Sequence, residues 1–145
     1  MNEQEYIEQR LEYQINWYSQ KSQYNQTWFK RLRLSEIISA TFIPFLSGMG
    51  DKVPCGPWLI GGLGVFIAVA AASGSLFKFH ENWIQYRTTA EQLKHEKFLY
   101  LTGTKPYESE DKFSALVQRI EGLISKENSS WSQVVKKVGK TSDKA

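Results

Sequence analysis

The sequence has one cysteine, four prolines and, over one stretch of 20 residues, no charged side chain. A single cysteine excludes an intrachain disulfide scaffold. Aromatic residues make up 14% of the chain, which is too many for a disordered protein. The net charge is only +3, and acidic and basic residues are interleaved, which argues against a nucleic-acid-binding face. The first ten residues, MNEQEYIEQR, lack an apolar core, so we expect no cleavable secretory signal.

The uncharged stretch, residues 58–77, is the strongest signal in the chain. The mean hydropathy of −0.42 is that of an ordinary soluble protein, but polarity is distributed unevenly. As a helix, these residues rise about 30 Å, the hydrocarbon thickness of a bilayer. Their four glycines are common in transmembrane helices. The alternative is the buried core helix of a soluble bundle. We expect a transmembrane helix.

A second apolar segment, residues 34–50, precedes it. Its uncharged part, IISATFIPFLSGMG, is short enough to be an interfacial or core segment instead. Basic residues lie on the outer flanks of both segments, at Lys30, Arg31, Arg33, Lys78 and Arg87. The connecting turn, residues 51–57, holds one acid and one base. By the positive-inside rule, both segments cross the cytoplasmic membrane and both termini are cytoplasmic.

The flanking regions, residues 1–33 and 78–138, have helical periodicity and no early breaker. A continuous helix over residues 57–102 would be roughly 69 Å long. Gly103 and Pro106 end it, and a further helix starts near Ser109. A short last helix carries Trp131, and residues 139–145 are predicted to be a disordered tail. The predicted fold is therefore an all-α membrane protein, a two-helix transmembrane hairpin whose long helices extend into a cytoplasmic helical bundle, assembled as a homo-oligomer.

Small side chains repeat along one side of the second segment. This small-xxx-small pattern lets helix backbones approach closely in lipid. The pattern does not decide whether the partner helix belongs to the same chain or to a neighbour. The predicted packing residues are Gly61, Gly64, Ala68, Ala72 and Ser75.

Polar and small residues also line one side of the first segment. At about 100° per residue they fall close to a common line, which predicts the wall of a cation pathway. The predicted lining residues are Glu36, Ser39, Ala40, Ile43, Ser47 and Asp51. Carboxylates attract cations, and the apolar ring at Ile43 could gate by dewetting. Instead of lining a pore, Glu36 could equally well form an ion pair with Arg33. Asp51 could simply be a residue of an exposed turn.

No enzymatic motif is present, neither a P-loop nor a GxSxG nucleophile, so we expect no catalytic activity and no cofactor beyond a permeant monovalent cation. The pairs His80–Glu81 and Glu91–His95 do not make a metal site, because two ligands are too few. Arg87 and Glu91 are spaced as an ordinary ion pair. Cys55 is either a lone small residue or a crosslink between subunits.

The residues carry a resemblance to a bacterial two-transmembrane family of unknown function that is related to the SLATT effector domains. The resemblance covers residues 6–131. It rests on Tyr6, Arg10, Leu11, Trp17, Tyr18, Lys21, Trp83, Tyr86, Arg87, Ala90, Glu91, Leu93, Lys94, Glu96, Tyr107, Phe113, Glu127 and Trp131. It implies an all-α membrane protein that assembles into a pore. SLATT members are proposed pore-forming effectors in nucleotide-signalled conflict systems, and this chain has no fused sensor segment.

We therefore expect a homo-oligomeric, cation-selective channel of the cytoplasmic membrane. One lining helix per subunit requires roughly four to six copies, with about five favoured. Sodium is favoured over potassium, because no carbonyl filter resembling TVGYG is present. The expected partners are further copies of the chain and membrane lipid, with no nucleic acid and with a cytoplasmic protein left open. The alternatives are a membrane-anchored interaction module and a signal-opened effector pore that depolarises the membrane.

Overall fold

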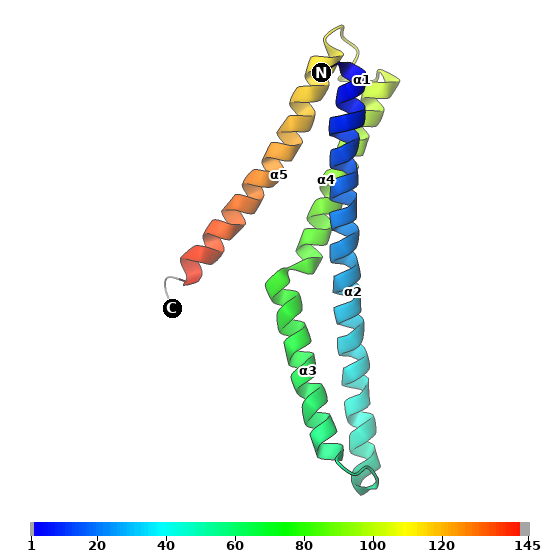
Figure 1. The fold of residues 1–145 in the computed structure, drawn as a ribbon, viewed down its shortest axis with the longest axis vertical. Coiled ribbons are helices and arrows are strands. Elements are labelled where there is room, and N and C mark those ends of the chain that lie inside the picture. Colours follow the sequence, from blue (N-terminus) through cyan, green and yellow to red (C-terminus); the bar gives the residue numbers. More distant parts are fainter. Residues whose placement is uncertain (1, 143–145) are drawn as a thin grey trace. The chain divides into compact units, whose positions relative to one another are not determined.

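The computed structural model describes residues 2–142, with side chains described for residues 2–50 and 52–129. All regular structure in this part of the chain is helical, which confirms the all-α prediction. Three helices are long, namely α2, α4 and α5, and α3 is nearly as long as α4 (Figure 1). The order is α1 (Glu3–Glu5), η1 (Tyr6–Leu11), α2 (Glu12–Met49), η2 (Gly50–Lys52), α3 (Gly56–Phe77), α4 (Phe79–Thr102) and α5 (Lys112–Ser142).

The first three elements form one uninterrupted helical stretch. Asn2 caps its start by accepting a hydrogen bond from the Glu5 backbone, and the Glu5 side chain accepts one from Asn2 in return. A π-helical turn, η1, joins α1 to α2. The absence of glycine before residue 48 lets the helix continue, and it runs through Pro44. The predicted unbroken helix is confirmed.

Helix α3 is bounded by two residues in the left-handed conformation, Cys55 (φ 69°) and Lys78 (φ 49°). Pro57 occupies the first turn, where its missing N–H leaves no bond unmade. The prediction of one continuous helix over residues 57–102 is wrong, because the chain breaks at Lys78. The Asn82 side-chain amide donates to the Phe77 carbonyl at 3.1 Å and so satisfies a group that the break exposes.

Helix α4 ends as predicted, at a left-handed Gly103 (φ 63°). The Thr104 amide donates back to the Leu99 carbonyl, the closing bond of a Schellman motif. The predicted separate last helix is wrong, since α5 continues without a break to Ser142. The helix thus extends into the predicted tail of residues 139–145, of which residues 143–145 lie outside the described residues.

The chain divides into two compact units, each described here by itself. The first comprises residues 1–20 and 86–145. Its core is apolar and draws on the N-terminal helix, on α4 and on α5, with Leu11, Leu93, Leu116 and Ile120 fully buried. The predicted apolar face of the helix after Ser109 is confirmed, because Leu116, Ile120 and Ile124 are buried in this core.

The second unit, residues 21–85, is a helical hairpin in which the second half of α2 runs antiparallel to α3 (Figure 1). On α3 the less exposed residues recur at alternating steps of four and three, as in coiled-coil packing. They are Gly56, Ile60, Leu63, Ile67, Ala70 and Gly74, and Ser73 beside them is also only partly exposed. The matching face of α2 carries Leu32, Ser35, Glu36, Ser39, Ile43 and Leu46. These two faces pack against each other, so the remaining sides of α2 and α3 form the outer surface of the hairpin.

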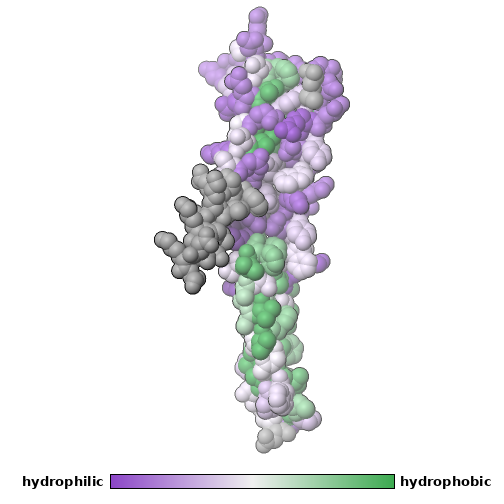
Figure 2. Space-filling view, turned by 60° about the vertical axis from the view of Figure 1, so that its left-hand side comes forward, coloured by the Kyte–Doolittle hydropathy of each residue, from purple (hydrophilic) through white to green (hydrophobic). Residues whose placement is uncertain are grey.

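The outer side of the hairpin is apolar and exposed, as the hydrophobic surface in the lower part of Figure 2 shows. Trp58, Val65 and Leu76 are between 66% and 84% exposed. Within the described residues, one stretch, Gly56–Thr102, which comprises α3, the break at Lys78 and α4, is long and apolar enough to cross a membrane, and only 6% of its most apolar window is buried. Within the described chain, this window is therefore not buried as the core helix of a soluble bundle would be. Residues 34–50 do not reach the same combination of length and mean hydropathy.

Candidate functional site

A cavity of about 300 Å³ lies where the apolar part of the hairpin meets its charged end. We call it the junction pocket. From α2 it is lined by Phe29, Leu32, Arg33 and Glu36, and from α3, α4 and the break between them by Ala71, Gly74, Ser75, Lys78, His80 and Glu81. The break at Lys78 places the first charged residue after α3 on its wall. The junction pocket therefore combines apolar, cationic and anionic walls.

The charged residues of the junction pocket form two ion pairs. Arg33 donates to Glu36 at 2.9 Å, and the Lys78 ammonium lies 3.6 Å from the Glu81 carboxylate. The Glu36 side chain is only 12% exposed, whereas that of Arg33 is 67% exposed. The His80 ring lies 4.8 Å from the Phe29 ring. The pairing of Glu36 with Arg33, one of the two readings of that carboxylate, is confirmed.

The predicted lining residues of α2 do not all share one free face. Glu36, Ser39 and Ile43 lie on the side turned to α3, with Ser39 buried and the other two half-buried. Ala40 and Ser47 are exposed at the edge of that side. The side chain of Asp51 lies outside the described residues. The structure thus brings Glu36, Ser39 and Ile43 together along the groove between the two helices.

The predicted packing residues of α3 lie on a different side from the one that contacts α2. Gly61, Gly64, Ala68, Ala72 and Ser75 are all exposed, and a Cβ added at Gly61 or Gly64 would meet nothing within 4 Å. The sequence left open whether this stripe packs within the chain. In the described hairpin it does not, because α2 packs against the neighbouring face of α3.

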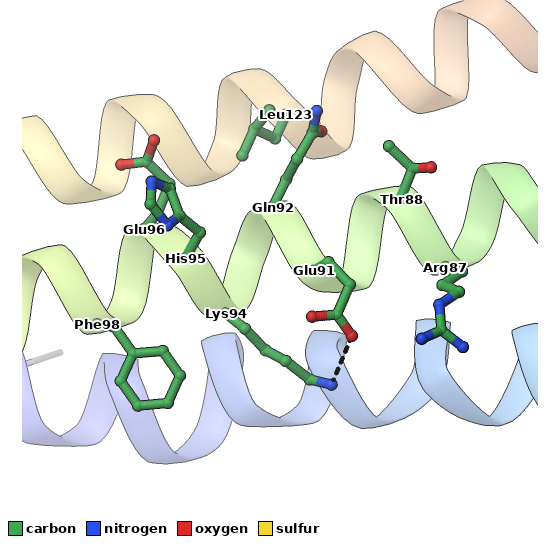
Figure 3. Close-up of a pocket in the computed structure, with 9 residues that line it drawn as sticks. All are labelled: Arg87, Thr88, Glu91, Gln92, Lys94, His95, Glu96, Phe98 and Leu123. Atoms are coloured by element: carbon green, nitrogen blue, oxygen red, sulfur yellow. Dashed lines mark hydrogen bonds and ion pairs between the residues drawn. The ribbon is translucent and has the colours of Figure 1, made fainter.

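A second, more open cavity of about 770 Å³ lies along α4, and its lining side chains project from two sides of that helix (Figure 3). Its wall is mostly α4, with Leu123 contributed by α5. The predicted Arg87–Glu91 pair is wrong, since Glu91 accepts from Lys94 at 3.1 Å instead. Glu96 on the same wall is held by Arg119. Its acids are thus already neutralised by neighbouring bases.

Sequence reasoning missed the buried carboxylate of Glu96. Arg119 donates two hydrogen bonds to it, at 2.8 and 2.6 Å, and the Tyr107 hydroxyl donates a third. The signal was available in the spacing, because Glu96 falls between Leu93 and Tyr100 on the apolar face of α4. The hydrogen bonds from Arg119, with a further contribution from Tyr107, hold the pKa of Glu96 below its ordinary value despite burial.

A similar cluster joins η1 to α5. Arg10 donates two hydrogen bonds to Glu121 at 3.1 Å, and the Tyr6 hydroxyl donates to the same carboxylate. The bonds from Arg10 lower the pKa of Glu121, while burial and the nearby carboxylate raise the pKa of Tyr6 to about 12. Tyr18 donates likewise to Glu127 at 3.2 Å. Each group has a structural partner, and none is poised for proton transfer.

Among the described residues there is no cluster of three or more metal-binding side chains. The family comparison decides the identity: a family described as "protein of unknown function (DUF4231)" matches residues 13–115. The chain belongs to the DUF4231 family. The match confirms the resemblance to a family of unknown function. It shows no link to the SLATT domains, which stays a prediction. No curated protein and no solved structure matches this DUF4231 chain.

Proposed function

We propose that this chain is the subunit of a homo-oligomeric, cation-selective channel in the cytoplasmic membrane. The hairpin of residues 34–77 crosses the bilayer, both termini are cytoplasmic, and about five copies surround the pore. The permeant ions are monovalent cations, with sodium favoured. A single hairpin cannot enclose water, so the pore requires several copies.

The observation that carries the proposal is the line of polar groups on α2 within an otherwise apolar hairpin. Polar and ionisable groups at membrane depth are costly unless they face protein or water. Glu36 lies at the inner end of this line, half-buried against α3, and Ser47 lies exposed near its outer end. In the assembly, the edge of α2 that carries Ala40 and Ser47 faces the pore axis. The exposed small-residue stripe of α3 then packs against the next subunit.

The test is current through bilayers that contain the purified protein. We expect cation currents, with the reversal potential in a salt gradient close to that of the cation. Glu36→Gln should reduce the preference for cations over anions, because it removes a negative charge at the pore mouth. Glu110→Gln removes an equal charge from an exposed loop residue and is the matched control. Silent bilayers over a range of protein amounts and voltages would overturn the proposal.

A second candidate, the membrane-anchored interaction module, is favoured by exposed apolar side chains in the first unit. Phe98 and Leu101 of α4 are 62% and 59% exposed, although both lie outside the apolar hairpin. Such side chains can recruit a cytoplasmic protein. The oligomeric state separates the two functions, because a monomer or dimer cannot surround a pore. Depolarisation and growth arrest on overexpression would mark the signal-opened effector pore.

A further inference from the structure

Of the four charged residues of the junction pocket, the proposed pore uses only Glu36. The lining of the pocket combines two bases, Arg33 and Lys78, and two acids, Glu36 and Glu81, with apolar residues that include Phe29, Leu32 and Ala71. At about 30 Å³ per water molecule, its 300 Å³ holds roughly ten waters. This is room for a phosphate ester and an amine.

Arg33 and Lys78 each have N–H donors that are not used by the acidic residue beside them. A guanidinium has five N–H donors in a planar fork, and one nitrogen of Arg33 serves Glu36. The Lys78 ammonium is 3.6 Å from Glu81, too far for a hydrogen bond, and its side chain is 44% exposed. Arginine and lysine with free donors on facing walls are suited to bind phosphate oxygens.

The position of the junction pocket along the hairpin restricts the ligand further. Lys78 is the first charged residue after the uncharged residues 58–77, and Arg33 is the last base before the other apolar segment. If the hairpin spans the membrane as proposed above, this level is that of the inner headgroups. The apolar lining residues then meet the glycerol end of a lipid, and the charged ones meet its headgroup.

We propose that the junction pocket binds the headgroup of a zwitterionic phospholipid with a primary amine. Arg33 and Lys78 hold the phosphate, and the carboxylates of Glu36 and Glu81 accept from the ammonium. Two bases and two acids sum to zero, so the pocket as a whole complements a headgroup that carries one charge of each sign. A purely anionic headgroup would leave both carboxylates facing a like charge. The inference rests on the membrane insertion in the proposed function.

The test is lipid retention measured by native mass spectrometry on protein purified in detergent. The protein is offered phosphatidylethanolamine, phosphatidylglycerol or phosphatidylcholine at equal concentration. We expect the first to bind best, because it alone provides both a phosphate and N–H donors for the carboxylates. The variant Arg33→Gln with Lys78→Gln should bind it about tenfold more weakly, the loss expected for removing charge-assisted hydrogen bonds.

The matched control is Lys30→Gln with Arg31→Gln, which removes two exposed bases of the same turn of α2 that do not line the pocket. It should leave retention unchanged. Equal loss in both double variants would overturn the proposal in favour of diffuse attraction to basic residues. Stronger binding of phosphatidylglycerol than of phosphatidylethanolamine by the wild-type protein would overturn it as well.

A second variant keeps the proposal testable if the double variant does not fold. Glu36→Gln removes the negative charge that attracts the ammonium and should shift the preference toward phosphatidylglycerol. An unchanged preference would count against the assigned role of Glu36 and overturn the paired-charge site. Flotation of vesicles separates this inference from the proposed function. Protein that does not float with vesicles refutes membrane insertion, whereas protein that floats without the lipid preference refutes only the pocket.

Discussion

At the scale of single residues, the first unit is organised around a carboxylate placed inside an apolar core. Glu96 is 7% exposed, yet it lies on the face of α4 that also buries Leu93 and Tyr100. A buried charge is tolerated only where hydrogen bonds replace its hydration. Arg119 from α5 and Tyr107 from the preceding loop supply those bonds. Glu96 therefore fastens the loop and α5 to α4.

Replacing this carboxylate should destabilise the first unit. Glu96→Gln keeps the shape but removes the charge, so the two bonds from Arg119 lose their ionic character. Hydrogen bonds to charged groups contribute about 1.5–3 kcal/mol each, and we expect a loss of about 2 kcal/mol in the free energy of unfolding. The measurement is the thermal midpoint of the purified protein by circular dichroism, which should fall by roughly 10 °C.

Glu91→Gln is the matched control, one helical turn and one residue away on the same helix. Glu91 pairs with Lys94 in an exposed i, i+3 arrangement, its side chain 56% exposed. Such surface pairs contribute little, at most about 0.5 kcal/mol. If Glu91→Gln lowered the thermal midpoint as much as Glu96→Gln, the loss of a negative charge, and not the loss of the buried cluster, would account for the lower stability.

The same clusters predict an acid limit to stability. The pKa values of Glu96 and Glu121 are lower in the folded protein than the ordinary value of 4.5, because arginines donate to both carboxylates. A carboxylate with a lowered folded pKa contributes stability that is complete above 4.5 and is lost as the pH falls through the lowered value. The thermal midpoint should therefore drop as the pH falls below 4.5.

The variant Glu96→Gln provides the check on this pH dependence. It removes one of the two titrating groups, so its midpoint should change less between neutral pH and about pH 3 than that of the wild-type protein. Parallel pH profiles for the two proteins would show that other carboxylates cause the acid loss. The comparison needs equal detergent and ionic strength, since exposed charges are screened by salt.

At the scale of elements, α3 uses two of its sides for different contacts. One side, with Ile60, Leu63 and Ile67, packs against α2 at coiled-coil spacing. The adjacent side, with Gly64 and Ala68, is exposed and has room for a close partner. Close approach of backbones is what stabilises helix pairs in lipid, where the hydrophobic effect between helices is absent. We propose this side as the contact between subunits.

A bulky residue on the exposed small side should therefore break the oligomer without disturbing the hairpin. Ala68→Leu adds volume where two backbones are predicted to meet, so we expect a shift toward monomer in detergent, measured by native mass spectrometry. Val69→Leu is the control, because Val69 is 60% exposed and lies about 100° further round the helix. An unchanged mass for Ala68→Leu would place the contact between subunits elsewhere.

The sequence predicted those helix boundaries that depend on residues at the boundary itself. The long N-terminal helix follows from the absence of glycine up to Gly48, and the end of α4 follows from Gly103, whose left-handed conformation costs glycine little. The break at Lys78 has no such signal, since lysine disfavours that conformation. At the break, the side chain of Asn82, four residues after Lys78, donates to the Phe77 carbonyl. The sequence alone does not distinguish this asparagine from others.

Of the candidate site, too, the sequence predicted only the contact that has a local cause. The spacing of Arg33 and Glu36 is sufficient to predict their ion pair, which is a contact within one helix. The junction pocket needs the register between α2 and α3, which brings Leu32 and Glu36 of α2 to one pocket with Ala71 and Gly74 of α3. Periodicity predicts which side of a helix is apolar, but it does not give the register between two helices. Lys78 and His80 were therefore not grouped with Glu36.

At the scale of the whole molecule, the polar average of the sequence conceals two environments. The mean hydropathy of −0.42 combines an uncharged run at residues 58–77 with 21 charged residues after it. Each described unit agrees with one environment: the first buries an apolar core under charged helices, and the second exposes its apolar side chains. An exposed apolar surface of this kind is stable in lipid, not in water. The proposed direction of insertion rests on where the bases lie.

The chain provides its own probe of that direction, because Cys55 is the only cysteine and is exposed in the turn between α2 and α3. In the proposed topology both termini are cytoplasmic, so this turn is expected to lie outside. A membrane-impermeant maleimide should therefore label Cys55 in cells whose cytoplasmic membrane is intact, and labelling should be seen as a mass shift of the purified protein. The pattern follows from topology alone and needs no ion current.

The control places the cysteine on the opposite side of the membrane. Cys55→Ser combined with Gln20→Cys moves the thiol to an exposed residue of α2 that precedes the basic flank at Lys30 to Arg33. This variant should be labelled only after the membrane is permeabilised. Labelling of both thiols in intact cells, or of Cys55 only after permeabilisation, would contradict the proposed hairpin. The predicted orientation rests on the basic flanks. Labelling of Cys55 only after permeabilisation would therefore also show that the charge asymmetry of this chain does not determine its topology.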